Sequence, residues 1–187
     1  MAGFKFMHII QKITLVVFCI DALVGFSASV WNKRKLTFGN FETSILPLIL
    51  ALYFIPRMNF WSTNHAVILI VGLVLYLMGM GLAFVAFWHL GFTNSDDFWF
   101  ARKKSKKRYL VTSGPYTRIR HPIFVGLFLK FFAMVLTFFN LLTLGFFVVA
   151  LIFGIYTEFQ EEKFMQKLFP EYEKYKKGTN MFIPKIL

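Results

Sequence analysis

The sequence lacks the common signatures of disulfide, metal and nucleotide sites. Cys19 is its single cysteine, which excludes an intrachain disulfide and a cysteine-based zinc cluster. The four histidines are far apart and form no His-x-x-x-His pair, so we expect no metal. There is no Gly-x-x-x-x-Gly-Lys phosphate loop, and Gly79-Met80-Gly81 falls inside an apolar run instead of following a strand. A nucleotide-like cofactor would therefore be bound without a Rossmann fold.

Acidic residues are also scarce, with nine Asp and Glu against 21 Lys and Arg and a net charge of +12. A basic chain can bind nucleic acid or anionic lipid, and the placement of its charges separates these two interpretations. Of the 187 residues, 57% are hydrophobic and 26 are Phe. A soluble domain of this length has no interior large enough for so much apolar surface. The composition predicts a membrane protein, and the one-sided placement of its basic residues, given below, accounts for the net charge without a nucleic-acid partner.

Apolar segments predict an all-α polytopic membrane protein with about five transmembrane helices, each near the ~20 residues that a bilayer requires. The segments are His8 to Val30, Thr43 to Phe60, Asn64 to Trp88, Pro122 to Phe139, and Leu141 to Thr157. The first reads as a retained helix, since no small-x-small cleavage site follows it. The second contains two prolines, which leaves open whether it spans fully. Three small residues in the third, Gly72, Gly79 and Gly81, suit close helix packing.

The last two segments are separated only by Asn140 and its neighbours, so we expect a tight helical hairpin. Beyond Thr157, charged and apolar residues alternate in steps of three and four. This pattern predicts cytoplasmic amphipathic helices at the membrane surface, interrupted at Pro170 because proline lacks a backbone N–H.

Basic residues concentrate on one side of this layout. With the N-terminus outside, Lys5, Lys12 and Arg57 lie outside. Seventeen lie inside, namely Lys33 to Lys35, the six between Arg102 and Arg108, Arg118, Arg120 and the six lysines from Lys163 onward. The positive-inside rule then places the C-terminus in the cytoplasm. Lys130 falls within the fourth span, where a charge is costly, so we expect it to face the helix bundle or to snorkel.

Two polar clusters flank the hairpin. Arg118, Arg120 and His121 directly precede Pro122, where a helix N-terminus and two guanidinium groups favour an anion. The alternative is a set of ordinary interfacial anchors. Glu158, Glu161 and Glu162 follow the fifth span, and the hairpin should bring them near the first cluster. They can pair with the arginines or accept hydrogen bonds from a ribose, or they form a solvated acidic patch.

Two sequence blocks in the C-terminal half carry a family resemblance. The first is Leu110 to Gly126, with Gly-Pro-Tyr and Arg-His-Pro; the second holds Glu-Glu and Tyr-x-x-Tyr-Lys and precedes Phe182-Ile183-Pro184. In this order and spacing they resemble the isoprenylcysteine carboxyl methyltransferase family. The resemblance covers Tyr109 to Pro184, with Pro170 where Gly is usual and Phe124 where Tyr is common. It divides the chain into 1–108, with three spans and a basic loop, and a catalytic, cofactor-binding part at 109–187.

The resemblance implies that S-adenosylmethionine is bound beneath the hairpin and that the carboxylate of a prenylated cysteine is methylated. The implied catalytic residues are Arg120, Glu161 and Glu162. Backbone groups of Leu110, Val111 and Thr112 would contact the adenine, and Tyr116 and His121 the methionine end. Glu158 and Tyr172 complete the implied cofactor contacts.

The implied substrate is a prenylated protein or a small isoprenylcysteine, reached from the membrane lipids. The implied location is the endoplasmic reticulum of a eukaryote or the cell membrane of a prokaryote. Phospholipid methyltransferases share related C-terminal blocks. A phosphatidylethanolamine-type N-methyltransferase therefore stays an alternative, followed by a non-catalytic membrane scaffold. The oligomeric state is left open.

Overall fold

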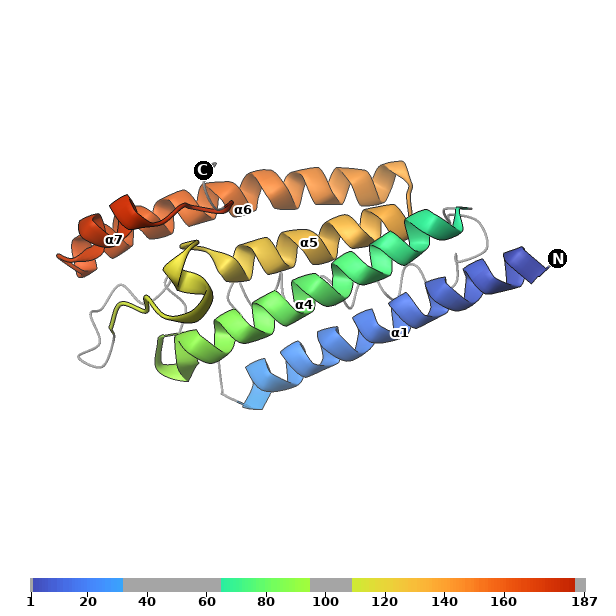
Figure 1. The fold of residues 1–187 in the computed structure, drawn as a ribbon, viewed down its shortest axis with the longest axis horizontal. Helices are drawn as coiled ribbons and strands as arrows, with labels where there is room; N and C mark the ends of the chain where they lie inside the picture. The colour runs from blue at the N-terminus through green and yellow to red at the C-terminus, as the bar shows by residue number, and fades with distance from the viewer. Residues whose placement is uncertain (1, 32–64, 95–108, 184–187) are drawn as a thin grey trace. The chain divides into compact units, whose positions relative to one another are not determined.

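The computed structural model describes residues 2–31, 65–94 and 109–183, and within these ranges it is all helical with no named strand (Figure 1). The elements are α1 (Ala2–Trp31), α4 (Ala66–Asn94), the 3-10 turn η3 (Gly114–Thr117), α5 (Pro122–Thr137), α6 (Leu141–Leu168) and α7 (Tyr172–Gly178). The predicted all-α fold is confirmed for this part of the chain. The possible span at 43–60 and the basic loop at 102–108 lie outside the described residues.

Two of the described helices are long and apolar enough to cross a membrane, α4 over Ala66–Gly91 and α6 over Leu141–Leu168. Helix α5 is apolar but shorter. A helix of 28 residues, such as α6, is about 42 Å long and exceeds a ~30 Å hydrocarbon layer, so one end of α6 is long enough to extend beyond that layer. These features support a membrane protein, while the count of five spans stays a prediction.

The predicted surface helix after Thr157 is a continuation of the span. Helix α6 runs unbroken through Thr157 to Leu168, and α7 begins at Tyr172 after Pro170. The predicted interruption at Pro170 is therefore confirmed, whereas the polar segment before it does not form a helix of its own. Because α6 is continuous, the orientation of its glutamates is coupled to that of the apolar span.

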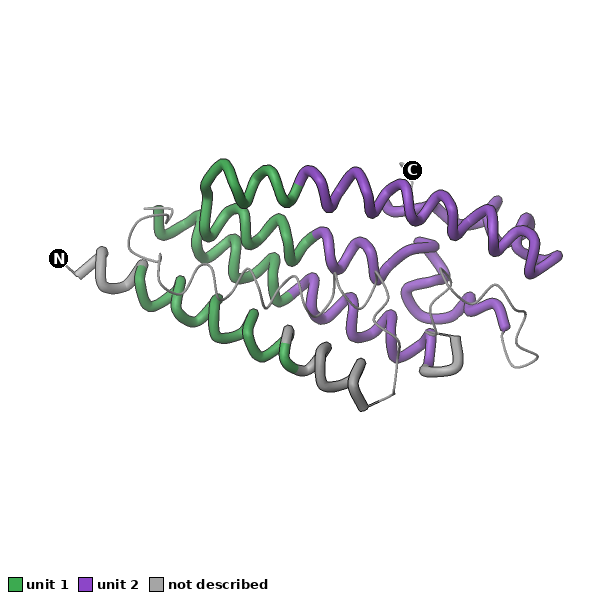
Figure 2. Tube along the Cα trace, turned by 180° about the vertical axis from the view of Figure 1, so that it is seen from behind, with its two compact units in different colours: residues 1–77, 129–147 green, residues 78–128, 148–187 purple. Residues whose placement is uncertain are grey.

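One compact unit comprises residues 1–77 and 129–147, coloured green in Figure 2. Its core contains Leu15, Phe18, Tyr76, Ala133, Met134 and Phe138. A Cβ at Gly72 would come within 2.7 Å of Thr137 Oγ1, so only glycine permits this approach of α4 to α5. The packing role predicted for Gly72 is confirmed, while Gly81 has no neighbour within 4 Å of such a Cβ.

Asn140 builds the hairpin as the N-cap of α6. Its Oδ1 accepts hydrogen bonds from the backbone N–H groups of Leu142 at 2.9 Å and Thr143 at 3.0 Å. The Thr143 hydroxyl donates to the Phe138 carbonyl at 2.9 Å. The short polar connection thus satisfies helix-end groups that would otherwise be costly in an apolar environment, and the predicted tight hairpin is confirmed.

Lys130 is paired with Asp21, a partner that the sequence pattern does not reveal. Lys130 Nζ lies 2.7 Å from Asp21 Oδ2, and the Tyr76 hydroxyl donates to the same oxygen at 2.9 Å. The two charged side chains are 14% and 23% exposed. A lysine on α5, an aspartate on α1 and a tyrosine on α4 therefore form one neutral cluster, and Lys130 faces the bundle as expected.

The second compact unit comprises residues 78–128 and 148–187, purple in Figure 2. One apolar cluster joins α4 to the segment before α5 through Ala86, Val111 and Tyr116, and another joins α6 to α7. A Cβ at Gly126 would lie 2.7 Å from the Gly79 carbonyl oxygen, which confirms that Gly79 lies at a close helix contact. This unit carries all ten residues that the resemblance assigns to the site.

Replacing Lys130 alone with leucine is expected to leave Asp21 unpaired in apolar surroundings and to destabilise the protein by about 3 kcal/mol. The double variant Asp21→Leu/Lys130→Leu removes both charges and should recover most of that loss. Thermal unfolding in detergent measures both, with exposed Lys12→Leu on α1 as the control. A double variant no more stable than Lys130→Leu would contradict the pairing.

Candidate active site

A short backbone pairing holds Arg120 and His121 in place ahead of α5. The N–H groups of Arg120 and His121 donate to the carbonyls of Asn180 at 2.9 Å and Met181 at 3.2 Å, and Asn180 N–H donates to the Arg118 carbonyl at 3.1 Å. Pro122 then begins α5, as expected for proline at the first helical position. The C-terminal segment thereby fixes the two residues that the sequence singles out.

Glu162 on α6 is the centre of the polar cluster. Arg120 Nε lies 2.5 Å from its Oε1, and Lys176 Nζ lies 2.9 Å from its Oε2. His121 Nε2 lies 3.5 Å from Oε1. The Glu162 side chain is only 5% exposed. Two adjacent basic residues ahead of α5 and one lysine of α7 therefore converge on one buried carboxylate, which is the usual way for a buried charge to be compensated.

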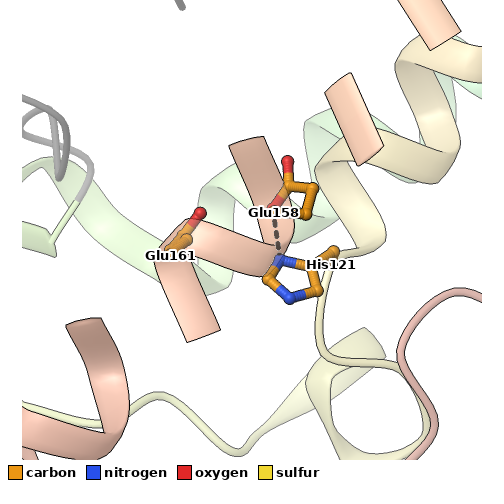
Figure 3. Close-up of side chains that lie close together, drawn as sticks. All are labelled: His121, Glu158 and Glu161. Carbon is orange, nitrogen blue, oxygen red and sulfur yellow. Dashed lines mark ion pairs between the residues drawn. The ribbon is translucent and has the colours of Figure 1, made fainter. Parts of the chain in front are cut away.

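His121 also contacts Glu158, one turn before Glu162 on α6. Its Nδ1 lies 2.5 Å from Glu158 Oε2, the ion pair drawn in Figure 3, and Glu161 lies beside them. His121, Glu158 and Glu161 place possible metal-ligand atoms within 4.8 Å of one another. The ion pair accounts for this approach by itself, and the expected absence of a metal stays a prediction.

The charges in this cluster stabilise one another. Burial alone would raise the pKa of Glu162, but the adjoining cationic groups of His121, Arg120 and Lys176 outweigh it and hold the pKa at about 2. Burial alone would lower the pKa of His121, but the carboxylates of Glu158, Glu162 and Glu161 together outweigh it and raise the pKa to about 10. At neutral pH the imidazole is therefore a cation and Glu162 an anion.

Glu161 behaves in the opposite way. Burial and the neighbouring Glu158 carboxylate raise the pKa of Glu161 to about 8. The Glu158–Glu161 pair thus holds one proton at neutral pH. Counting Arg120, His121 and Lys176 as positive, the cluster carries a net charge of about +1 at neutral pH.

The guanidinium of Arg120 is oriented from two sides. Its Nη1 donates to the carbonyls of Lys176, at 3.3 Å, and Thr179, while Nε is occupied by Glu162. Nη2 makes no hydrogen bond within the described part of the chain and is the remaining donor. A planar fork fixed in this way is suited to presenting one edge to an anion.

The structure brings five of the ten predicted site residues into this cluster: Arg120, His121, Glu158, Glu161 and Glu162. Leu110 and Tyr172 belong to the apolar cluster of Leu168 and Phe169. Val111 and Tyr116 pack with Ala86, and Thr112 is exposed. The roles assigned to all ten residues in binding and catalysis stay predictions.

Sequence reasoning missed Lys176 and the Thr179 carbonyl as members of the cluster. Lys176 lies in the Tyr-x-x-Tyr-Lys block, but its approach to Glu162 depends on the chain reversal after Leu168. It also missed Phe182, whose ring lies 4.9 Å from that of Phe124 and 5.9 Å from that of His121. A Cβ at Gly154 would collide with the Phe124 ring, so this ring packs against the backbone of Gly154.

The free energy of unfolding is expected to decrease as the pH rises from 5 to 8. Replacing Glu161 with glutamine should make this decrease smaller. The folded state keeps the Glu161 proton up to pH about 8, whereas the unfolded state loses it near 4.5. Stability from this group is thus fully present below pH 4.5 and is lost as the pH rises through 8. Melting temperatures in detergent measure the effect, with Glu173→Gln on α7 as the exposed control. Identical pH dependence of the Glu161→Gln variant and the wild type would contradict the assignment.

A family model described as phospholipid methyltransferase matches residues 67–172, more than half of the chain. No curated protein and no solved structure matches the chain. The matched range contains α4, α5, α6 and the start of α7, together with all ten predicted site residues. The chain therefore belongs to the phospholipid methyltransferase family.

Proposed function

We propose that the protein methylates a carboxylate carried by a lipid-modified cysteine, with S-adenosylmethionine as the methyl donor. Membership of the phospholipid methyltransferase family supports methyl transfer at a membrane, and enzymes of this family generally use this cofactor. The choice of a carboxylate acceptor rests on one observation, the convergence of Arg120, His121 and Lys176 on Glu162. The raised pKa of Glu161 is consistent with a surplus positive charge in this cluster. The sequence resemblance to isoprenylcysteine carboxyl methyltransferases points to the same acceptor.

An orphaned buried donor supports the fit of the cofactor. His121 is 8% exposed, and its Nε2 has no hydrogen-bond partner among the described residues. Glu158 engages Nδ1, and Nε2 lies 3.5 Å from Glu162 Oε1 without a hydrogen bond. Because the imidazole is positively charged, Nε2–H can donate to an added anionic group. We assign it to the carboxylate of the methionine moiety, with Tyr116 nearby and the backbone of Leu110 to Thr112 toward the adenine. The bound cofactor would supply an electrophilic sulfonium methyl group.

Arg120 takes the role of acceptor clamp in this proposal. Glu162 and the carbonyls of Lys176 and Thr179 fix the guanidinium, and Nη2 remains for the substrate carboxylate. A carboxylate is already ionised and needs no general base, so positioning in a water-poor site is the main requirement. Glu162 acts on Arg120 by orienting it. The lipid chain of the acceptor would stay in the bilayer, and the site would face the cytoplasm, where the positive-inside rule places the C-terminus.

A phospholipid amine is the second candidate acceptor, and the Glu158–Glu161 pair is the observation that favours it. An amine must lose a proton before or during methyl transfer. Once Glu161 is ionised, above pH about 8, the pair could accept that proton. The printed description of the matching family names phospholipids as well. A non-catalytic scaffold, the third reading, predicts that the protein does not bind S-adenosylhomocysteine.

Transfer of labelled methyl to farnesylated N-acetylcysteine, run beside phosphatidylethanolamine from pH 6 to 9.5, separates the two acceptors. We expect base-labile label on the cysteine compound. Its rate should fall roughly tenfold between pH 7 and 9, because ionisation of Glu161 removes the surplus positive charge.

The amine acceptor predicts the reverse, with label on the phospholipid and a rate that rises over the same range. Glu161→Gln keeps this position neutral and should abolish the alkaline loss for the cysteine compound. Label found only on the phospholipid would contradict the carboxylate assignment while leaving methyl transfer intact.

A further inference from the structure

The turn between Ser113 and Thr117 is constrained by its own backbone. Gly114 has a φ of +60°, in the region that favours glycine. The Tyr116 N–H donates to the Ser113 carbonyl at 3.2 Å, and the Thr117 hydroxyl donates to the Gly114 carbonyl at 2.8 Å. The turn directly follows Leu110 to Thr112, which the proposed function assigns to the cofactor. Its position therefore bears on cofactor binding.

His89 on α4 packs directly on this turn. A Cβ at Gly114 would lie 2.5 Å from both Cδ2 and Nε2 of the imidazole, so the ring occupies the space that any side chain would need. His89 Nδ1 lies 2.9 Å from the Val85 carbonyl oxygen one helical turn earlier, which orients the ring. Ala86 and Leu90, its neighbours on α4, pack against Val111 and Tyr116.

Tyr175 on α7 holds the same turn through a hydrogen bond. Its hydroxyl donates to the Tyr116 carbonyl at 2.7 Å. The ring packs edge to face with Tyr172, with centroids 5.8 Å apart, and Tyr172 is 2% exposed. Burial raises the pKa of Tyr175 to about 12, so the hydroxyl stays a donor at physiological pH. The contact is thus supported from inside the apolar cluster of α6 and α7.

We propose that His89 and Tyr175 are positioning residues that clamp the Ser113–Thr117 turn and thereby preorganise Leu110 to Tyr116 for the cofactor. This inference rests on the proposed function. It adds a residue of α4 to the site, since His89 lies on that helix. This residue is outside the 109–187 region that the sequence resemblance marks as catalytic. A loop held in its binding conformation loses less entropy on binding, so releasing the clamp should weaken affinity for the cofactor more than it slows the chemical step.

Equilibrium binding of S-adenosylhomocysteine to the full-length protein tests the clamp. Tyr175→Phe removes one oxygen atom and is expected to raise the Kd roughly fivefold, as for the loss of one neutral hydrogen bond. His89→Ala should raise it by a similar factor. In methyl transfer to farnesylated N-acetylcysteine, the KM for S-adenosylmethionine should rise in parallel while kcat stays within about twofold. Tyr156→Phe, at an exposed tyrosine of α6, is the matched control and should leave both constants unchanged.

The double variant His89→Ala/Tyr175→Phe tests whether both residues act through one turn. If they do, the two effects on Kd should be less than multiplicative, because one substitution already releases the turn. Fully multiplicative effects, or variants whose Kd equals that of the wild type, would overturn the clamp. A wild-type protein that binds no S-adenosylhomocysteine would overturn the proposed function and the clamp with it. The two failures are therefore distinguishable.

Discussion

The ion pair between Arg120 and Glu162 is the contact on which the candidate site depends. Glu162 is almost fully buried, so its charge is tolerable only because Arg120, Lys176 and His121 surround it. Arg120 in turn binds the carbonyls of Lys176 and Thr179, which lie on the returning C-terminal segment. One buried carboxylate thereby joins the start of α5, the polar end of α6 and the chain after Pro170. Without it, the cations would repel one another and the C-terminal segment would lose its main polar attachment.

Each compact unit contains charged side chains in a mostly apolar protein, and in each unit ion pairs compensate these charges. In the first unit, Lys130 and Asp21 cancel each other and Tyr76 completes the hydrogen bonding. The resulting cluster is neutral. In the second unit the Glu158–Glu161 pair retains a proton, so compensation is incomplete and one positive charge remains. A neutral cluster is suited to holding helices together, whereas surplus charge beside an unsatisfied donor at His121 is suited to binding an anion.

Much of the architecture follows from the sequence because apolar run length and helix punctuation are local properties. The hairpin at Asn140, the start of α5 at Pro122 and the interruption at Pro170 all lie where the residues predict them. The sequence also predicts the approach of Arg120 to Glu162, because a hairpin brings the ends of its two helices together. The sequence does not predict the partner of Lys130, because Asp21 is 109 residues away and no local pattern indicates the pair. Lys176 and His89 were missed for the same reason: their contacts depend on a chain reversal and on helix packing that no spacing rule encodes.

The account stands on the claim that the cluster around Glu162 forms a site for S-adenosylmethionine. Its most direct test is calorimetric titration of the detergent-solubilised protein with S-adenosylhomocysteine, comparing the wild type, Glu162→Gln and the exposed control Glu171→Gln. The account predicts saturable binding to the wild type and to the control. For Glu162→Gln it predicts affinity at least tenfold weaker, because a neutral amide no longer orients Arg120 and His121. Equal affinity for all three proteins, or no binding to the wild type, would contradict it.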